Sequence, residues 1–378
     1  YTLANTMLGT MTILSDGGIT SGVMAQGGKI WEDRTRLGRV LATGLELRRK
    51  FAIVSLLVSV PVLIFLLRRN EASWLATGLI VLALIPAFYA ALTDSLLEVI
   101  PKLHQSILPL QRNQAFVASM RLALSALTLF VFPWAFVAIL ASGVSRIYGN
   151  FRLRRIAAGF VDMTSEPDLE VRKSIVAMVR RILPGAIYFC LSGQIAVWLI
   201  SLFGNVASVA QLGALGRIST ALAVFNVLIG TLIVPRFARL KSNREILLKY
   251  FFQITVSIAM FSLSIVGFVY LFPHQILWLL GKDYSNLEFE LLLSIASACL
   301  SLVAGVFFAL YTSRGWVINP VILISFNVCA MIILVSINDV STLQGVLLFS
   351  LELVFADLTI SALYCLGKIM RVNSRLAL

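Results

Sequence analysis

A single arginine interrupts a long apolar stretch in the second half of the chain. The stretch covers residues 205–240, and Arg217 lies about nine residues, or about 13 Å, after the start of the apolar segment at residue 208. An arginine at such a depth costs about 2.5–3.5 kcal/mol on insertion scales, so it usually faces a wet or protein-lined interior. Small and hydroxylated residues near it favour close helix approach and polar crevices: Gly213, Gly216, Ser219 and Thr220. We therefore predict that Arg217, Ser219 and Thr220 line a substrate cavity, in which Arg217 contacts an anion.

A carboxylate occupies a comparable place near the start of the chain. Asp16 lies in the apolar sequence TILSDGGITSGVMA, where Gly17 and Gly18 allow close backbone approach or a bend. In a plan of two six-helix bundles, Asp16 falls on helix two and Arg217 on helix eight, which are corresponding positions. We predict that Asp16 faces the same cavity as a cation site, a proton site or a gating partner. The alternative is a structural ion pair.

Further charged residues lie within or beside apolar segments. Arg121 lies about eight residues, or about 12 Å, into its helix from the expected cytoplasmic side, where it could line the cavity or extend toward lipid phosphates. Glu352 and Asp357 cannot share one helix face well, so at most one of them lines a pathway. The basic run 27–50 could anchor to anionic lipid or capture a pyrophosphate headgroup. The candidates for headgroup capture are Arg34, Arg36 and Arg39.

The elements that carry these residues are predicted to be membrane helices. The chain has 378 residues, of which 59% are hydrophobic and 13% charged, whereas soluble domains carry about 25% charged residues. We predict an all-α integral membrane protein with roughly eleven apolar segments. These segments are 3–25, 51–67, 74–93, 115–131, 134–149, 183–203, 208–234, 249–272, 288–311, 317–337 and 343–367.

The distribution of Lys and Arg residues predicts the orientation. The net charge is +13, and nearly all cations lie in one set of alternate loops and in the C-terminal tail. The opposite set carries only Arg68, Arg69 and Lys282. The richer side is therefore expected to be cytoplasmic, with the C-terminus inside and Tyr1 outside. This arrangement suits a twelve-helix plan from which the first helix is missing.

An amphipathic segment divides the apolar segments into five and six. Residues with helical spacing along it form an apolar stripe: Val171, Ile175, Met178 and Ile182. We expect an N-terminal bundle over residues 1–149, a cytoplasmic linker over 150–182 and a C-terminal bundle over 183–378. Two bundles joined by such a linker are common in transporters, with the substrate route between the halves.

The sequence contains no pattern that indicates an enzyme. No metal-ligand spacing, nucleophile elbow or phosphate-binding glycine loop occurs. The cations lie between membrane segments rather than along one soluble face, which argues against nucleic acid as a partner. We expect no catalytic residue, metal or cofactor, and the sequence leaves a coupling ion, H+ or Na+, open.

Residues 183–240 resemble helices seven and eight of the Wzx-type polysaccharide (O-antigen) flippases of the MATE-like MOP superfamily. The shared features are Pro184 at the start of helix seven, a central arginine in a glycine-led helix eight, and the exit Pro235-Arg236. TILSDGGITSGVMA resembles the second helix of this family. The likeness spans nearly the whole chain, but Leu212 replaces a tyrosine that is common in the family.

This resemblance implies two six-helix bundles in a V that open alternately to each side. The cavity would take the headgroup of an undecaprenyl-pyrophosphate-linked oligosaccharide, with Arg217 and Arg121 neutralising its charge and the lipid tail in the bilayer. Such a flippase serves O-antigen, lipopolysaccharide or capsule assembly in the bacterial inner membrane, beside glycan polymerase and chain-length proteins. The alternatives are a MATE-type cation-coupled multidrug exporter, which an acidic cavity would favour, and a membrane glycan polymerase or ligase. Against the enzyme, the longest external loop, 273–287, contains one histidine and no arginine.

Overall fold

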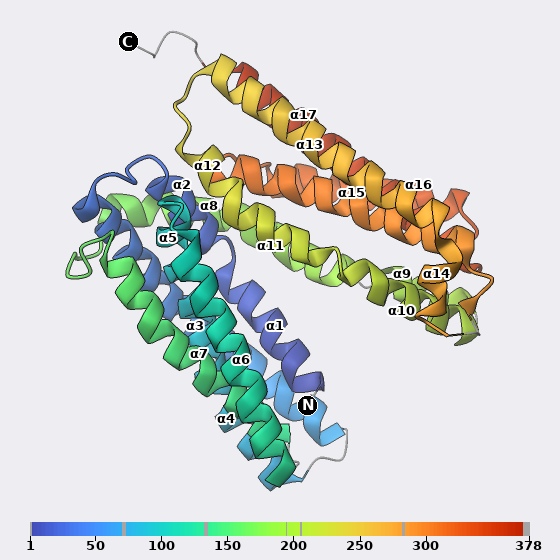
Figure 1. Cartoon of the computed structure of the whole chain (residues 1–378), viewed down its shortest axis with the longest axis horizontal. Coiled ribbons are helices and arrows are strands. Elements are labelled where there is room, and N and C mark those ends of the chain that lie inside the picture. Colours follow the sequence, from blue (N-terminus) through green and yellow to red (C-terminus); the bar gives the residue numbers. More distant parts are fainter. Residues whose placement is uncertain are drawn as a thin grey trace. The chain divides into compact units, whose positions relative to one another are not determined.

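The chain is built from helices, which Figure 1 shows in sequence colours. The computed structural model describes residues 2–69, 73–131, 135–193, 195–204, 206–281 and 284–372, and these ranges contain no β-strand. The sequence-based assignments for Tyr1, Lys282 and the last six residues lie outside these ranges. The chain divides into two units, Tyr1–Ile187 and Tyr188–Leu378, and each is described by itself.

Unit 1 consists of eight helices within the described residues, the last of which continues into unit 2. Their bounds are α1 Thr2–Asp16, α2 Ile19–Gly27, α3 Arg34–Arg69, α4 Trp74–Leu97, α5 Val99–Leu103, α6 Ile107–Val131, α7 Ala135–Ala158 and α8 Leu169–Ser192. Helix α4 packs against α7, α3 and α1, and α6 packs against α7. The core between these helices contains large apolar side chains, which include Met11, Leu63, Leu84, Phe88 and Ile139.

The predicted apolar stripe of the linker is buried in unit 1. Ile175, Met178 and Ile182 of α8 are all buried, and Val171 is half-buried. Two of them contact glycines of the α1–α2 region, since a Cβ added at Gly18 would lie 2.8 Å from Ile182 and one added at Gly22 would lie 3.1 Å from Ile175. The stripe therefore packs against α2.

Unit 2 contains nine further helices within the described residues. Their bounds are α9 Ile195–Phe203, α10 Val206–Thr220, α11 Ala223–Leu232, α12 Val234–Arg239, α13 Arg244–Leu271, α14 Pro273–Trp278, α15 Glu288–Ser313, α16 Pro320–Ile337 and α17 Leu343–Met370. Helix α15 is central, because it packs against α10, α11, α12, α13 and α17. Phe251 of α13 stacks on Phe307 of α15 with ring centroids 5.3 Å apart. Several helix starts are capped by side chains, as where Asn243 and Thr342 accept backbone N–H groups.

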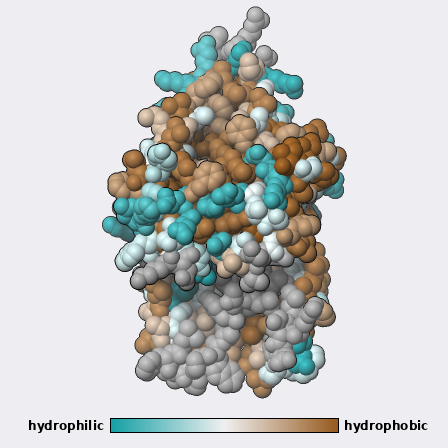
Figure 2. Space-filling model, turned by 90° about the vertical axis from the view of Figure 1, so that its right-hand side faces the viewer, coloured by the Kyte–Doolittle hydropathy of each residue, from teal (hydrophilic) through white to brown (hydrophobic). Residues whose placement is uncertain are grey.

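Six helices of the described chain are long and apolar enough to cross a membrane. They are Trp74–Leu103, Ala207–Arg239, Arg244–Leu271, Glu288–Ser313, Pro320–Ile337 and Leu343–Met370. Large aliphatic side chains lie exposed on several of them, as Met260 and Leu263 do on α13. Hydrophobic residues cover much of the described surface of the face in Figure 2. Exposed apolar area of this extent suits lipid rather than water, which supports a multi-pass membrane protein.

Several predicted segments are interrupted or extended in the structure. Segment 3–25 is divided by Gly17 and Gly18, and segment 208–234 is divided at residues 221–222 and again near Ile233. The predicted span 51–67 is the second half of α3, which begins at Arg34 because Asp33 accepts the N–H groups of Thr35 and Arg36. A hydropathy pattern alone does not reveal such helix caps and helix breaks.

Candidate functional site

Asp16 ends α1 and caps α2. Gly17 and Gly18 follow it with φ values of 46° and 98°, a left-handed backbone that glycine adopts readily. Gly18 N and Thr20 N donate to the two carboxylate oxygens of Asp16 at 3.3 Å each. A carboxylate at a helix N-terminus satisfies free N–H groups and complements the helix dipole. The predicted bend is confirmed, and Asp16 stabilises it.

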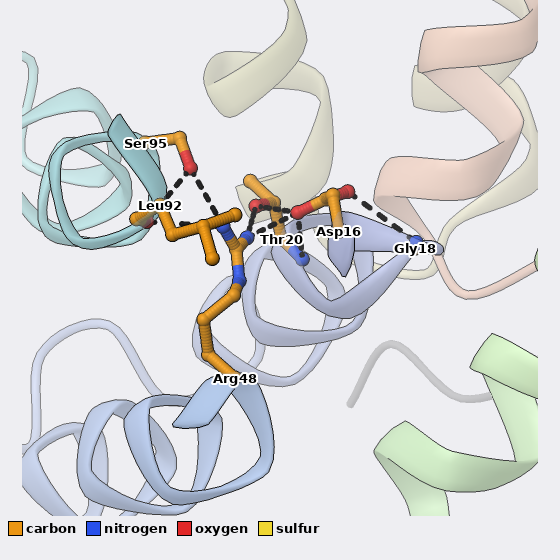
Figure 3. Close-up of polar contacts among 6 residues, drawn as sticks. All are labelled: Asp16, Gly18, Thr20, Arg48, Leu92 and Ser95. Carbon is orange, nitrogen blue, oxygen red and sulfur yellow. Dashed lines mark hydrogen bonds and ion pairs between the residues drawn. The ribbon is translucent and has the colours of Figure 1, made fainter. Parts of the chain in front are cut away.

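Arg48 of α3 forms an ion pair with Asp16, as Figure 3 shows. Its guanidinium donates to Asp16 Oδ1, to Thr20 Oγ1 at 2.6 Å, and to Leu92 O and Ser95 Oγ of α4 at 3.0 Å each. The side chain of Arg48 is 3% exposed and that of Asp16 is 29% exposed. The pair therefore joins three helical elements and leaves part of the carboxylate open. A cation or proton site at Asp16 stays a prediction.

Arg217 lies in the last turn of α10 with its side chain exposed. It forms no ion pair with any residue that the structure describes. Thr220 donates its hydroxyl to the carbonyl of Arg217 at 2.5 Å, while Ser219 bonds to Ser294 of α15 at 3.0 Å. Both hydroxyls are therefore already engaged within unit 2, whereas the guanidinium is available to a ligand.

The surface of α10 around Arg217 is open. No atom of the described chain lies within 4 Å of a Cβ built at Gly213 or Gly216. Among the described residues, no other helix makes the close approach that these glycines allow. Gly213, Gly216, Arg217 and Thr220 are all exposed, and their spacing places them on one helix face. This face combines small residues with one charge.

The C-terminal unit contains a pocket with a volume of about 500 Å³. Residues from α8, α9, α15, α16 and α17 line it, and most are apolar or aromatic, including Tyr188, Phe308, Tyr311 and Phe349. Asp357 is the acidic member of the lining, and Asn327 Nδ2 lies 3.5 Å from its Oδ1. No cationic side chain of the described chain pairs with it. A carboxylate among aromatic rings is suited to a cation.

Glu352 occupies a different environment from Asp357. Asn338 donates to Glu352 Oε2 at 2.7 Å, and Glu352 is not part of the pocket lining. Of these two carboxylates, Asp357 therefore lines this pocket and Glu352 does not. The described residues contain no group of three or more His, Cys, Asp or Glu side chains arranged to hold a metal ion.

The remaining predicted residues lie apart from these features. Arg121 is exposed on α6 and pairs with no acidic residue of the described ranges. Arg34 donates to the carbonyl of Ala158 at 3.2 Å, and Arg36 pairs with Asp33 at 3.3 Å. Arg39 is exposed. Capture of a headgroup by these residues stays a prediction.

Several solved structures share this arrangement of helices. A MATE protein in complex with MaD5 has a TM-score of 0.79 at 16% identity, covering 98% of this chain and 87% of that chain. An outward-facing multidrug resistance MATE family transporter of the MOP superfamily also has a TM-score of 0.79, at 17% identity over 98% and 88%. The chain has a MATE-like transporter fold. A MOP superfamily transporter from Pyrococcus furiosus, described as having a binding pocket of reverse polarity, has a TM-score of 0.74 at 17% identity over 97% and 85%.

Among the comparisons, only those with solved structures support this MATE-like fold. No protein-family profile and no curated protein sequence match the chain. At 16–17% identity the likeness extends to the fold and not to the substrate. The charged residues of this chain must therefore carry any argument about what is transported.

Two residues that contact these candidate site residues are not predicted from the sequence. Nothing in the sequence distinguishes Arg48 from Arg49 and Lys50, which lie beside it in the same basic run. The sequence signal for a polar contact at Asp16 is Thr20, which lies one helical turn later and presents a hydroxyl on the same side. Asn327 lies within an apolar segment and comes near Asp357 only through the packing of α16 on α17.

Proposed function

We propose that this chain is a transporter that moves an anionic, lipid-linked oligosaccharide across a membrane by alternating access. The cargo is the headgroup of an undecaprenyl-pyrophosphate-linked O-antigen or capsule unit, and the membrane is the bacterial inner membrane. The lipid tail stays in the bilayer while Arg217 neutralises charge on the headgroup. No bond is made or broken, so the chain acts as a carrier and not as an enzyme.

The observation that carries this proposal is the open face of α10. A helix face that contacts lipid carries large apolar side chains, such as the exposed Met260 and Leu263 of α13. The face around Arg217 instead carries glycines with free space above them. Small residues beside an unpaired guanidinium leave room for a bulky anion and provide donors suited to phosphate.

The acidic pocket favours a second candidate function. Asp357, Asn327 and the aromatic rings beside them suit an organic or monovalent cation, which supports a cation-coupled exporter. Both uses are compatible with the same fold, because the Pyrococcus furiosus neighbour is described as having a pocket of reverse polarity and a different function. The two candidates differ in the charged residue that is essential for transport, which is Arg217 for an anionic cargo and Asp357 for a cationic one.

Replacing each charge in turn separates the two candidates. In a strain that depends on this chain, Arg217→Ala should abolish surface glycan while the protein remains in the membrane, and Arg217→Lys should restore part of it. Arg180→Ala, an exposed cation elsewhere, is the matched control and should have no effect. Normal glycan in Arg217→Ala at equal expression, together with loss of organic-cation efflux in Asp357→Asn, would replace the first candidate with the second.

A further inference from the structure

A second pocket lies within unit 1, between α4 and α7. Its volume is about 320 Å³, and its lining comes from one face of each helix. The residues are Pro86, Tyr89, Ala90 and Thr93 of α4 and Ile147, Asn150, Phe151 and Arg154 of α7. The polar end of the pocket is close to where both helices end, since α4 ends at Leu97 and α7 at Ala158. Arg217, Asp16 and Asp357 are not among its lining residues.

The pocket is apolar at its rim and basic at one end. Phe151 is 62% exposed, and Tyr89 and Ile147 are also exposed, so the rim suits acyl chains. Arg154 is exposed and forms no ion pair with a described residue. Its neighbour Arg152 differs, because its guanidinium lies over the ring of Phe116 at 4.8 Å. An arginine at the end of a membrane helix lies at the depth of lipid phosphates.

One residue of the lining, Asn150, carries a buried acceptor that a ligand donor could satisfy. Asn150 is 8% exposed, and its Nδ2 donates to the carbonyl of Ala90 at 2.9 Å. Its Oδ1 is buried and has no hydrogen-bond partner among the described residues. A buried acceptor without a partner is unfavourable, so a ligand N–H or O–H group placed there would be stabilised.

We propose that this pocket binds a glycerophospholipid whose headgroup carries a hydrogen-bond donor, such as an ethanolamine or glycerol headgroup. The phosphate binds Arg154, the ammonium or hydroxyl donates to Asn150 Oδ1, and one acyl chain lies along Ile147 and Phe151. Bare undecaprenyl pyrophosphate could place its phosphate on the same arginine, but it has no ammonium or alcohol hydroxyl to donate to the amide, so this probe separates the two kinds of lipid. Occupancy by membrane lipid does not depend on which cargo is transported.

Lipid binding to the purified full chain tests this assignment. Native mass spectrometry would compare phosphatidylethanolamine, phosphatidylglycerol, phosphatidylcholine and undecaprenyl pyrophosphate as probes. Arg154→Gln removes a charge-assisted contact with the phosphate, so it should weaken the binding of phosphatidylethanolamine and phosphatidylglycerol by about tenfold. Arg155→Gln, the adjacent cation outside the pocket lining, is the matched control and should bind as wild type does. Phosphatidylcholine, which lacks the donor, should bind weakly to all three proteins.

A second measurement keeps the assignment falsifiable if a variant is unstable. A photoactivatable phosphatidylethanolamine should crosslink to the wild-type chain within α7, at residues 147–154. Crosslinks elsewhere, equal binding by Arg154→Gln and wild type, or equal affinity for phosphatidylcholine would each overturn the proposal. If Arg154→Gln lost binding of undecaprenyl pyrophosphate but kept binding of the phospholipids, that result would also overturn the proposal, in favour of a cargo site.

Discussion

Arg48 of α3 forms an ion pair with Asp16, the residue at which α1 ends and the α2 cap begins. Because the guanidinium also donates to Leu92 O and Ser95 Oγ of α4, one side chain holds three helical elements together.

Breaking this pair from one side should strongly destabilise unit 1. Asp16→Asn leaves the Arg48 guanidinium buried without its counter-ion, which costs about 3–5 kcal/mol when a buried ion pair loses one member, and Arg48→Leu should cost less because Asp16 is partly exposed. The double variant should lose less than the sum of the two single variants. Thermal unfolding in detergent measures this, and strictly additive losses would mean that the two side chains are not coupled.

Gly18 should tolerate no side chain. Its φ of 98° disfavours L-residues, and a Cβ would lie 2.8 Å from Ile182, so Gly18→Ala should cost about 1–3 kcal/mol. Combining it with Ile182→Ala should relieve the clash but not the strain. Gly213→Ala is the control, because its Cβ meets no described atom and its helical position should gain about 0.5–1 kcal/mol. Equal melting temperatures for the two glycine variants would contradict the described contact.

Asp357 should make the stability of the protein depend on a cation. A ligand present at about 100 times its dissociation constant stabilises the folded protein by about 2.7 kcal/mol. Melting temperatures measured against Na+ or an organic cation should therefore rise for wild type and not for Asp357→Asn. Glu352→Gln, whose carboxylate bonds Asn338 outside the pocket, should respond as wild type does. Identical titrations for Asp357→Asn and wild type would exclude the pocket as the cation site.

The loop before α8 should loosen in acid. Hydrogen bonds from the Thr164 side chain and backbone lower the pKa of Asp162. A carboxyl group with a lowered folded-state pKa stabilises the loop above its unfolded pKa, and this contribution disappears as the pH falls through the folded value. The protection factors of residues 159–168, which compare the observed exchange rate with the intrinsic rate at each pH, should therefore fall at low pH. Thr164→Val should shift that loss of protection to higher pH, and an unchanged profile would contradict the role of Thr164.

The sequence was sufficient for the helical architecture because each relevant signal is local. Apolar runs predicted the helices, Gly17 and Gly18 predicted the interruption after Asp16, and the spacing of Ile175 and Ile182 predicted the buried face of α8. The all-α, MATE-like fold is confirmed by the solved structures that it resembles.

The contacts of the charged residues depend on long-range packing, so they could not be predicted from local sequence signals. Arg48 is separated from Asp16 by 32 positions and is chemically identical to its exposed neighbour Arg49. The pocket around Asp357 requires five helices to pack together. Periodicity gives the face of a helix on which a residue lies, but it does not give the partner that the face meets.

The placement of Asp16 and Arg48 also bears on the order in which the protein is assembled. Both emerge from the ribosome well before α17 is synthesised, and the Arg48 guanidinium is costly to bury without its partner. Early association of α1, α2 and α3 would neutralise that charge during insertion. Nascent chains that lack Asp16 should consequently be retained by the insertion machinery or degraded before the second unit is complete.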